Sequence, residues 1–517
     1  MATTHREALK AACLVACTSG ALMHAGLVQA QTRTHSVTPK IAVKVEHTDN
    51  VDSVSNTAQQ PRRSENTLTL NPMLMFEHRG ADTTLDGSFG ILAEQRLNNT
   101  GADRVSPDGF VRWRTLLREQ GLGLDASLQS QQVPPSIASV GQGIDSTSTT
   151  STQTRANFSP TLERRLNERQ SLRLQGNGLL IRTDPRDDTH RTLRTRASNV
   201  QLSWLSRPAP MGYAIEARSL NEHSTVETPA VITGTNASRE IGETRQRSLS
   251  ATLMYAWGEE LQIGVLAGVE EDRRRVTFDT PSTKLQLDRD FDGPFGGFQL
   301  TWHPTPRTTF AGRYERHETG RTWNADFSHR MRRTTFALIS SQSTVRNTPT
   351  LTTDLGQLAS SGLIASTPTS STLTADRNAV TNAALGVQRN LALRVTYEGV
   401  RATLNLTSGR FQSRALLSAS TQTNGTDRSR YHAALVSYRL TTNITPSAGL
   451  RWNRAQDGLG VSRREWVGSL GLAVRLSPQT EFSGGFSLLR SRGTSIATSD
   501  SSLTVVRSAN VRLEHRF

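Results

Sequence analysis

Cysteine, lysine and long apolar runs are all scarce in this sequence, and each scarcity excludes a class of protein. The two cysteines, Cys13 and Cys17, lie near the amino terminus, so the rest of the chain has no disulfide framework, cysteine nucleophile or cysteine metal site. After residue 30, no stretch approaches the roughly 18–20 apolar residues that a membrane-spanning helix requires. Apolar residues make up 35% of the chain, which is low for one large globule.

The first 30 residues predict a cleaved secretory signal. Arg6 and Lys10 precede an apolar stretch, and Val28-Gln29-Ala30 then fits a small-residue cleavage site. Lipoprotein-type cleavage at Cys17 is the alternative, but the apolar run continues beyond that residue. We therefore expect a signal peptide at 1–30 and an exported mature chain at 31–517.

Positive charge is abundant, and nearly all of it is arginine. The formal net charge is +15, and we count only four lysines in the chain: Lys10, Lys40, Lys44 and Lys284. Either the protein presents an anion-attracting surface or lumen, or a GC-rich genome favours arginine codons. The largest basic cluster, Arg273-Arg274-Arg275, directly follows Glu270-Glu271-Asp272. No nucleic-acid partner is therefore expected for an exported chain of this kind.

Alternation with a period of two residues fills the mature chain. Leu249, Ala251 and Leu253 alternate with polar residues in one such segment, and Trp466, Leu470 and Leu472 lie on one face of another. Segments of about ten residues recur about 22 times. A membrane barrel needs only every second residue to be apolar, because its interior can be wet. Low hydropathy and abundant strand are therefore compatible.

Connectors between these segments alternate between short turns and long polar loops. The long ones include 49–65, 132–152, 222–243, 272–288, 343–386 and 412–428. Short turns on one side and long loops on the other are typical of bacterial outer-membrane barrels. We predict an all-β, transmembrane antiparallel β-barrel of about 22 strands (range about 18–24) in the bacterial outer membrane. Both chain ends are expected on the periplasmic side.

The end of the chain predicts a closing strand. Val511, Leu513 and Phe517 form its apolar face, and we interpret them as a signal for the barrel assembly machinery. This strand should pair with the segment at 41–45. Trp204, Trp257 and Trp302 each end a segment before a short turn, so we predict a periplasmic aromatic girdle there.

Several motifs resemble one protein family. They are the stretches 293–296 and 300–309, followed by 314–317 and 327–334, with 45–51 and the 476–478 turn. Together they resemble the outer-membrane β-barrel proteins associated with PEP-CTERM/exosortase systems. The sequence departs from the family at His303 and at His515. The resemblance implies a place in exopolysaccharide export or envelope assembly and no established reaction, with polysaccharide export proteins or an anionic glycan as partners.

No catalytic or metal-binding constellation stands out. The chain has no Gly-x-Ser-x-Gly motif and no His/Asp cluster with metal spacing, so no enzyme activity, cofactor or metal is predicted. Asp288, Asp290 and Asp292 match the first half of a calcium loop, but Gln299 stands where that loop has its bidentate glutamate. A solvated acidic loop is the preferred interpretation, with a weak calcium site as the alternative.

Charged residues on the inward face are the best candidates for function. Residue parity predicts that the following line a pore: Arg112, Arg114, Arg313, Arg401, Arg451, Arg475, Arg512 and Glu465. They would form a conduit for an anionic solute, or opposed charges would hold a wide lumen together. The 343–386 loop is expected to form a constriction or a short helix in the pore, with a surface loop as the alternative. The function predicted is a channel or assembly factor for exopolysaccharide export, surrounded by outer-membrane lipid and lipopolysaccharide; the alternatives are a passive anion-leaning porin and a structural barrel with a plugged lumen.

Overall fold

The computed structural model of this protein shows 22 β-strands in one antiparallel sheet. The predicted signal peptide at 1–30 lies outside the residues that the structure describes, and so do 346–385 of the predicted long loop. The described residues are 34–50, 62–98, 103–117, 119, 121–133, 151–184, 192–228, 238–280, 283–318, 320–345, 386–415, 426–456, 462–494 and 501–517.

The strands agree with the predicted segments in number and closely in position. In chain order they are β1 (Thr34–Thr48), β2 (Glu65–Arg79), β3 (Thr83–Arg96), β4 (Arg104–Leu117), β5 (Leu122–Val133), β6 (Ser151–Arg165), β7 (Gln170–Asp184), β8 (Thr192–Ser206), β9 (Met211–Thr228), β10 (Ser238–Trp257), β11 (Leu261–Thr280), β12 (Thr283–Thr305), β13 (Thr308–His317), β14 (Gly320–Arg330), β15 (Thr334–Val345), β16 (Gly386–Glu398), β17 (Ala402–Ala415), β18 (Thr426–Tyr438), β19 (Ile444–Gln456), β20 (Ser462–Arg475), β21 (Thr480–Thr494) and β22 (Ser501–Arg516).

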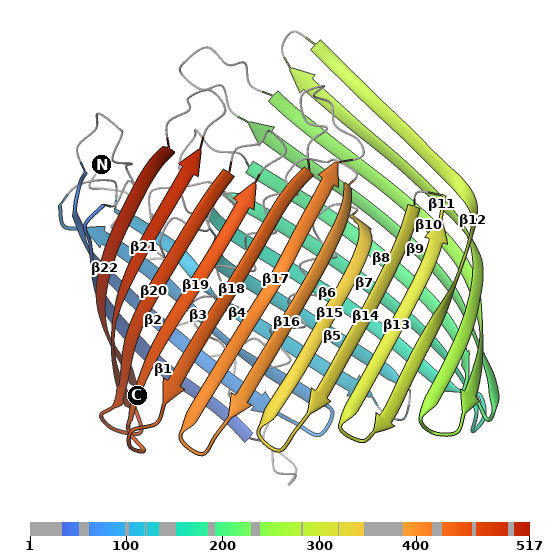
Figure 1. Ribbon diagram of the computed structural model, residues 1–517, viewed down its shortest axis with the longest axis horizontal. Coiled ribbons are helices and arrows are strands. Elements are labelled where there is room, and N and C mark those ends of the chain that lie inside the picture. Colours follow the sequence, from blue (N-terminus) through green and yellow to red (C-terminus); the bar gives the residue numbers. More distant parts are fainter. Residues whose placement is uncertain are drawn as a thin grey trace, which may run out of the picture.

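The first and last strands close the sheet into a barrel (Figure 1). Each strand pairs antiparallel with its neighbours in the chain, and β1 pairs with β22 from Lys40 opposite Arg516 to Thr48 opposite Ser508. Phe517 adds a last contact, because its N–H donates to the Pro39 carbonyl at 3.0 Å. The predicted fold, the strand number and the closing partner are therefore confirmed.

The two faces of the wall differ because successive side chains of a strand point to opposite sides. On β22, Val511 and Leu513 are 49% and 45% exposed on the outer face, whereas Arg512 and Glu514 between them point inward. Residues directly opposite one another on paired strands share a face, so the register extends this division around the barrel. The outer face is the lipid-facing one. Among the described residues, no helix is long and apolar enough to span a membrane.

The short turns lie together at one end of the barrel, where side chains stabilise them. Asn167 Oδ1 accepts the N–H groups of Arg169 and Gln170 at 2.9 and 2.8 Å. The Ser477 hydroxyl accepts those of Gln479 and Thr480 in the same way, at 3.2 and 3.0 Å. Such side chains mimic a backbone turn, which explains why Asn and Ser stand at these positions.

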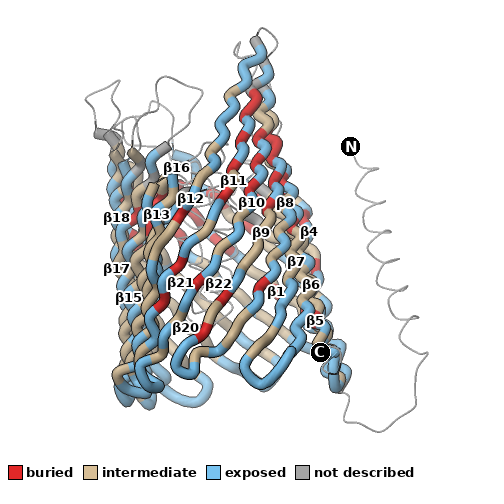
Figure 2. Tube along the Cα trace, turned by 90° about the vertical axis from the view of Figure 1, so that its right-hand side faces the viewer, coloured by how far each residue is buried: buried red, intermediate tan, exposed pale blue. Residues whose placement is uncertain are grey.

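Two predicted loops, 222–243 and 272–288, are largely strand instead. β9 continues to Thr228 and β10 begins at Ser238, while β11 runs to Thr280 and β12 begins at Thr283. These hairpins rise above the rest of the wall (Figure 2), and we call the upper parts of β9 to β12 the extension. Both faces of the extension contain polar and charged residues, so the apolar half of the alternation disappears although the strands continue. The prediction was wrong there because it equated polarity with a loop.

Candidate functional site: the inner wall and its periplasmic mouth

An ion-pair cluster on β4 and β5 shows how the inner wall is built. Arg112 and Arg114 both reach the Asp125 carboxylate, at 2.7 and 2.9 Å. They lie two residues apart on one strand, so they share the inward face, while Trp113 between them is exposed on the outer face. On the other neighbouring strand, Asp86 stands directly opposite Arg112. These two predicted pore residues are inward, and each has an acidic partner.

A second inward cluster lies on β11 to β14. Arg313 Nε donates to Glu315 at 2.6 Å, and His317 lies between Glu315 and Glu270, with nitrogen–oxygen distances of 3.1 and 2.9 Å. The His317 ring also stacks on Phe295, with centroids 4.8 Å apart. Arg313 is therefore part of a charge network. Residue parity places Arg313, Glu315 and His317 on one face of β13, but the contact of His317 with Glu270 reaches across β12 and depends on the register of β11 to β13.

Arg451 and Glu465 face inward on β19 and β20 but differ from open pore-lining residues. Glu465 is only 3% exposed and forms an ion pair with Arg463 at 2.6 Å. Arg451 lies opposite Val467, which belongs to a small buried apolar cluster with Leu489 and Val506. These charges are packed into the wall, so they contribute to its structure rather than to the exposed lumen surface.

The periplasmic mouth concentrates positive charge where the barrel closes. Glu514 is approached by Lys40 at 2.8 Å, by Arg512 at 2.9 Å and by Arg516 at 3.6 Å. One carboxylate therefore faces three cations. The predictions included Arg512 as a pore residue, whereas Lys40 was missed as a candidate. Its place follows from the β1–β22 register, which the predicted closing pair would have revealed.

Two predicted pore residues lie at the edge of this periplasmic mouth rather than within the wall. Arg475 is the last residue of β20 and stands opposite Glu481. Arg401 lies in the turn between β16 and β17, where its carbonyl accepts the Arg439 N–H at 2.6 Å. Both side chains are exposed.

The extension contains a buried acid that the sequence did not indicate. Glu222 on β9 faces Thr244 and, one strand further, Arg274, which forms an ion pair with Asp272 at 2.6 Å. The outward residues at this level are charged, for example Arg245 and Arg273, so Glu222 lies beyond the apolar part of the wall. Burial raises the pKa of Glu222 to about 7, against the opposing effect of the positive charge on Arg274. This carboxyl group can therefore change its charge near neutral pH.

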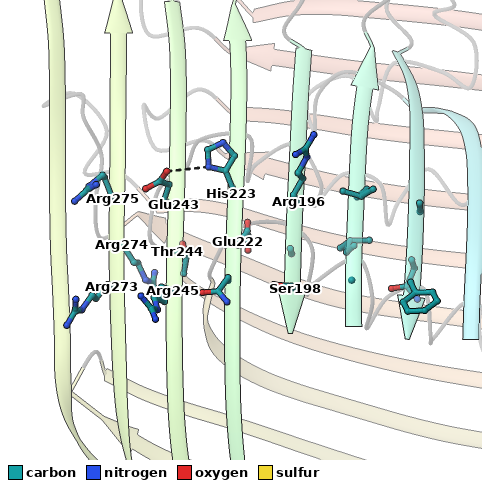
Figure 3. A pocket seen from close by; sticks show the side chains of 18 of the residues that line it. Arg196, Ser198, Glu222, His223, Glu243, Thr244, Arg245, Arg273, Arg274 and Arg275 are labelled. Carbon is teal, nitrogen blue, oxygen red and sulfur yellow. Dashed lines mark ion pairs between the residues drawn. The ribbon is translucent and has the colours of Figure 1, made fainter. Parts of the chain in front are cut away.

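A shallow concavity of about 830 Å³ reaches from β6, β7 and β8 in the wall to β9 to β12 in the extension (Figure 3). On its outer face Arg275 forms an ion pair with Asp288 at 3.0 Å, and His223 Nδ1 lies 3.5 Å from the Glu243 carboxylate. Asp288, Asp290 and Asp292 lie along strand β12 rather than in a loop, so the preferred reading of 288–292 as a loop was wrong. An extended strand also spaces alternate residues too widely for an EF-hand-type loop. Among the described residues, no group of three or more His, Cys, Asp or Glu side chains is arranged to hold a metal ion.

The predicted girdle and assembly residues lie on the outer face near the short turns. Trp204, Trp257 and Trp302 are exposed there, and Trp302 stands opposite Leu261, the first residue after the turn that follows Trp257. Val511, Leu513 and Phe517 are exposed on the same face. His515, the departure from the expected pattern, accepts or donates a hydrogen bond with Thr480 Oγ1 at 2.8 Å, so its polar ring is satisfied beside lipid. The girdle and assembly roles stay predictions.

Comparisons with known proteins bear on the fold. No family model and no curated protein matches the sequence. Among solved structures, the ferric citrate transporter FecA in its unliganded form is 12% identical, with a TM-score of 0.52, covering 93% of this chain and 78% of that one. The closed form of the ferric-catecholate import receptor Fiu from E. coli K12 is 10% identical, with a TM-score of 0.52, covering 93% and 82%.

At this level of identity the likeness shows the fold alone. This protein is a closed, antiparallel 22-strand β-barrel of the bacterial outer membrane, and its structural neighbours are a transporter and an import receptor. The outer-membrane location also means that lipid surrounds the wall.

Proposed function

We propose that this protein is a non-enzymatic conduit through which a hydrophilic solute crosses the outer membrane. The observation that carries this proposal is the set of hydrogen-bonded and paired charged residues on the inner face, from Glu514 at the mouth to Arg112 and Glu315 further along the wall. Such a face suits water, whereas the outer face suits lipid.

The sequence resemblance supports a finer proposal. We infer that the conduit serves a PEP-CTERM/exosortase-associated envelope system as a channel or assembly factor for exopolysaccharide export. Its partners would be the barrel assembly machinery, lipopolysaccharide, polysaccharide export proteins and an anionic glycan. Deleting the gene and measuring secreted polysaccharide tests this role, because normal output would contradict it while leaving a pore intact.

A passive, anion-leaning porin is the second candidate, and the mouth cluster favours it. Lys40, Arg512 and Arg516 around Glu514, with Arg475 opposite the neighbouring Glu481, leave a local positive excess that would attract anions entering from the periplasm. In planar bilayers, the double variant Arg512→Gln with Arg516→Gln should lower the permeability ratio of chloride over potassium. The matched control removes Arg332 and Arg333, which lie in the turn between β14 and β15.

Conductance also distinguishes an open conduit from a plugged barrel. A steady current from the purified protein supports the conduit, and the double mouth variant should then change selectivity more than the turn control. Absence of any current across many insertions would contradict both pore functions and favour the structural barrel with a plugged lumen.

A further inference from the structure

A run of outward-facing arginines lies at the end of the barrel opposite the short turns. On each of six neighbouring strands, β17 to β22, the first charged residue reached on the outer face after the apolar stretch is an arginine. All six are exposed, and together we call them the arginine belt: Arg410, Arg430, Arg454, Arg464, Arg490 and Arg507.

Apolar and aromatic residues below the belt mark the edge of the membrane. On the outer face of β20, Leu472 and Leu470 are followed by Trp466 and then by Arg464. Trp466 lies beside Trp452 on β19, with ring centroids 6.3 Å apart, and Trp452 stacks on His432 at 5.2 Å. Because amphipathic aromatic rings gather at the level of lipid headgroups, the belt lies where headgroups begin.

The belt places like charges directly against one another. The register sets Arg430 opposite Arg410 on one side and opposite Arg454 on the other, and Arg454 is also opposite Arg464. Adjacent strands are about 4.8 Å apart, and like charges at directly opposed positions destabilise a sheet. This arrangement therefore needs counter-charge.

The described part of the wall does not supply that counter-charge on the belt's own face. Among the described side chains of β17 to β22, the carboxylates are Glu465, Glu481 and Glu514, and all three lie on the inward face. At the β22 end, Asp49 accepts the backbone N–H of Arg507 at 2.7 Å. Asp457 and Asp500 lie outside the described residues. The centre of the belt, at Arg430 and Arg454, is therefore far from the nearest described acid on its face.

We propose that the arginine belt binds the phosphate-bearing headgroups of outer-leaflet glycolipid. Guanidinium groups match phosphate oxygens in bidentate fashion, and a row of them fits a surface of closely spaced phosphates. Long loops face the cell exterior in barrels of this type, which puts the belt in the outer leaflet. The inference depends on the outer-membrane location and is independent of the proposed conduit, so either can fail without the other.

Lipid binding to the folded, purified protein in neutral detergent tests the proposal. The probe is bisphosphorylated lipid A, compared with the same lipid after removal of both phosphates, with binding measured by native mass spectrometry. The triple variant Arg430→Gln, Arg454→Gln and Arg464→Gln should bind bisphosphorylated lipid A about a hundredfold more weakly than the wild type. The wild type should bind the dephosphorylated lipid as weakly as the variant binds the bisphosphorylated lipid.

A matched control is available on the other side of the extracellular rim, which is the end of the barrel opposite the short turns. Arg247, Arg273 and Arg275 also face outward, but their strands carry acids on that face, so their triple glutamine variant should keep most of its lipid binding. Equal losses in both variants, undiminished binding by the belt variant, or equally good binding of the dephosphorylated lipid would each overturn the proposal. So would inorganic phosphate that competes as well as the lipid does, because it would indicate an anion site without lipid preference.

Folding of the variants is checked separately by heat-modifiable migration in gels. If the triple belt variant does not fold, the single Arg454→Gln variant takes its place, with a smaller but measurable loss of binding. In neutral detergent the substitution should raise thermal stability, because it relieves repulsion, and in glycolipid it should lower it. A purely structural role of Arg454 would lower stability in both environments.

Discussion

Two parts of the same rim handle positive charge in different ways. On β10 to β12, outward arginines share their face with acids, as in the pairs Arg273 with Glu271 and Arg275 with Asp288, although Arg245 also stands opposite Arg273. On β17 to β22, the arginine belt has arginines beside arginines. The first part rises above the membrane into water, where no lipid can neutralise it, and the second ends at the membrane edge. We therefore expect the outward arginines of the first part to be neutralised by acids of the sheet, and those of the arginine belt by lipid phosphates.

The largest effect should come from a charge placed on the apolar, lipid-facing surface, below each of the two parts of the rim. Leu470 on β20 and Leu253 on β10 are 63% and 57% exposed near the middle of the outer apolar stretch. Leu470→Arg and Leu253→Arg should each destabilise the folded barrel by up to about 4 kcal/mol, because each puts a guanidinium into hydrocarbon. Unfolding in lipid vesicles measures this. If one variant were harmless, the apolar belt would not be continuous, and the two sides would differ by more than rim charge.

The next effect concerns pH and is confined to the extension. Because the pKa of Glu222 is raised to about 7 from an ordinary value of 4.5, the folded state keeps a proton that the unfolded chain has lost between these values. Local stability should therefore be complete below about pH 4.5 and fall as pH rises to about 7, by up to about 3 kcal/mol. Hydrogen exchange of β9 and β10 amides between pH 5 and 8 should show the loss.

Glu222→Gln is the matching variant, since glutamine keeps the shape and has no charge to develop. Its β9 and β10 protection should stay constant over that pH range, while the amides of β19 and β20 should not respond in either protein. A wild-type extension whose protection does not change with pH would contradict the assigned pKa.

The smallest effect compares single arginines in the two parts of the rim. In neutral detergent, Arg454→Gln should stabilise the barrel by a few tenths of a kcal/mol, because it relieves repulsion. Arg275→Gln should destabilise the barrel, because it removes the ion pair with Asp288. Both effects should shrink at high salt. Changes of the same sign in both variants would remove the distinction between the two parts.

Much of the barrel was predictable from the sequence because a strand in a membrane wall follows a strict rule of alternation. The 22 strands, the short turns and the β1–β22 closure all followed from it. The rule fails where the wall leaves the lipid, so 222–243 and 272–288 were assigned to loops although most of these residues are strand.

The alternation of side chains along each strand could indicate which residues face inward, but not which residues they contact. It placed Arg112 and Arg114 inside, yet it could not show that they share Asp125, because that depends on the register of β4 with β5. It also could not separate Arg451 and Glu465, which pack within the wall, from residues exposed to the lumen. Each arginine of the belt borders an apolar stretch in the sequence, but only the register of β17 to β22 shows that the six arginines lie side by side.

The contrast between the two parts of the rim can be measured directly with single cysteines, since the predicted mature chain has none. Arg273→Cys, Arg454→Cys and Pro478→Cys would be treated on intact cells with a polymer-linked maleimide that cannot cross the outer membrane. We expect rapid labelling at 273, slow labelling at 454 that becomes rapid once detergent removes the glycolipid, and labelling at 478 only after the membrane is permeabilised. Equal labelling of 273 and 454 on intact cells, or labelling of 478 from outside, would contradict this expectation.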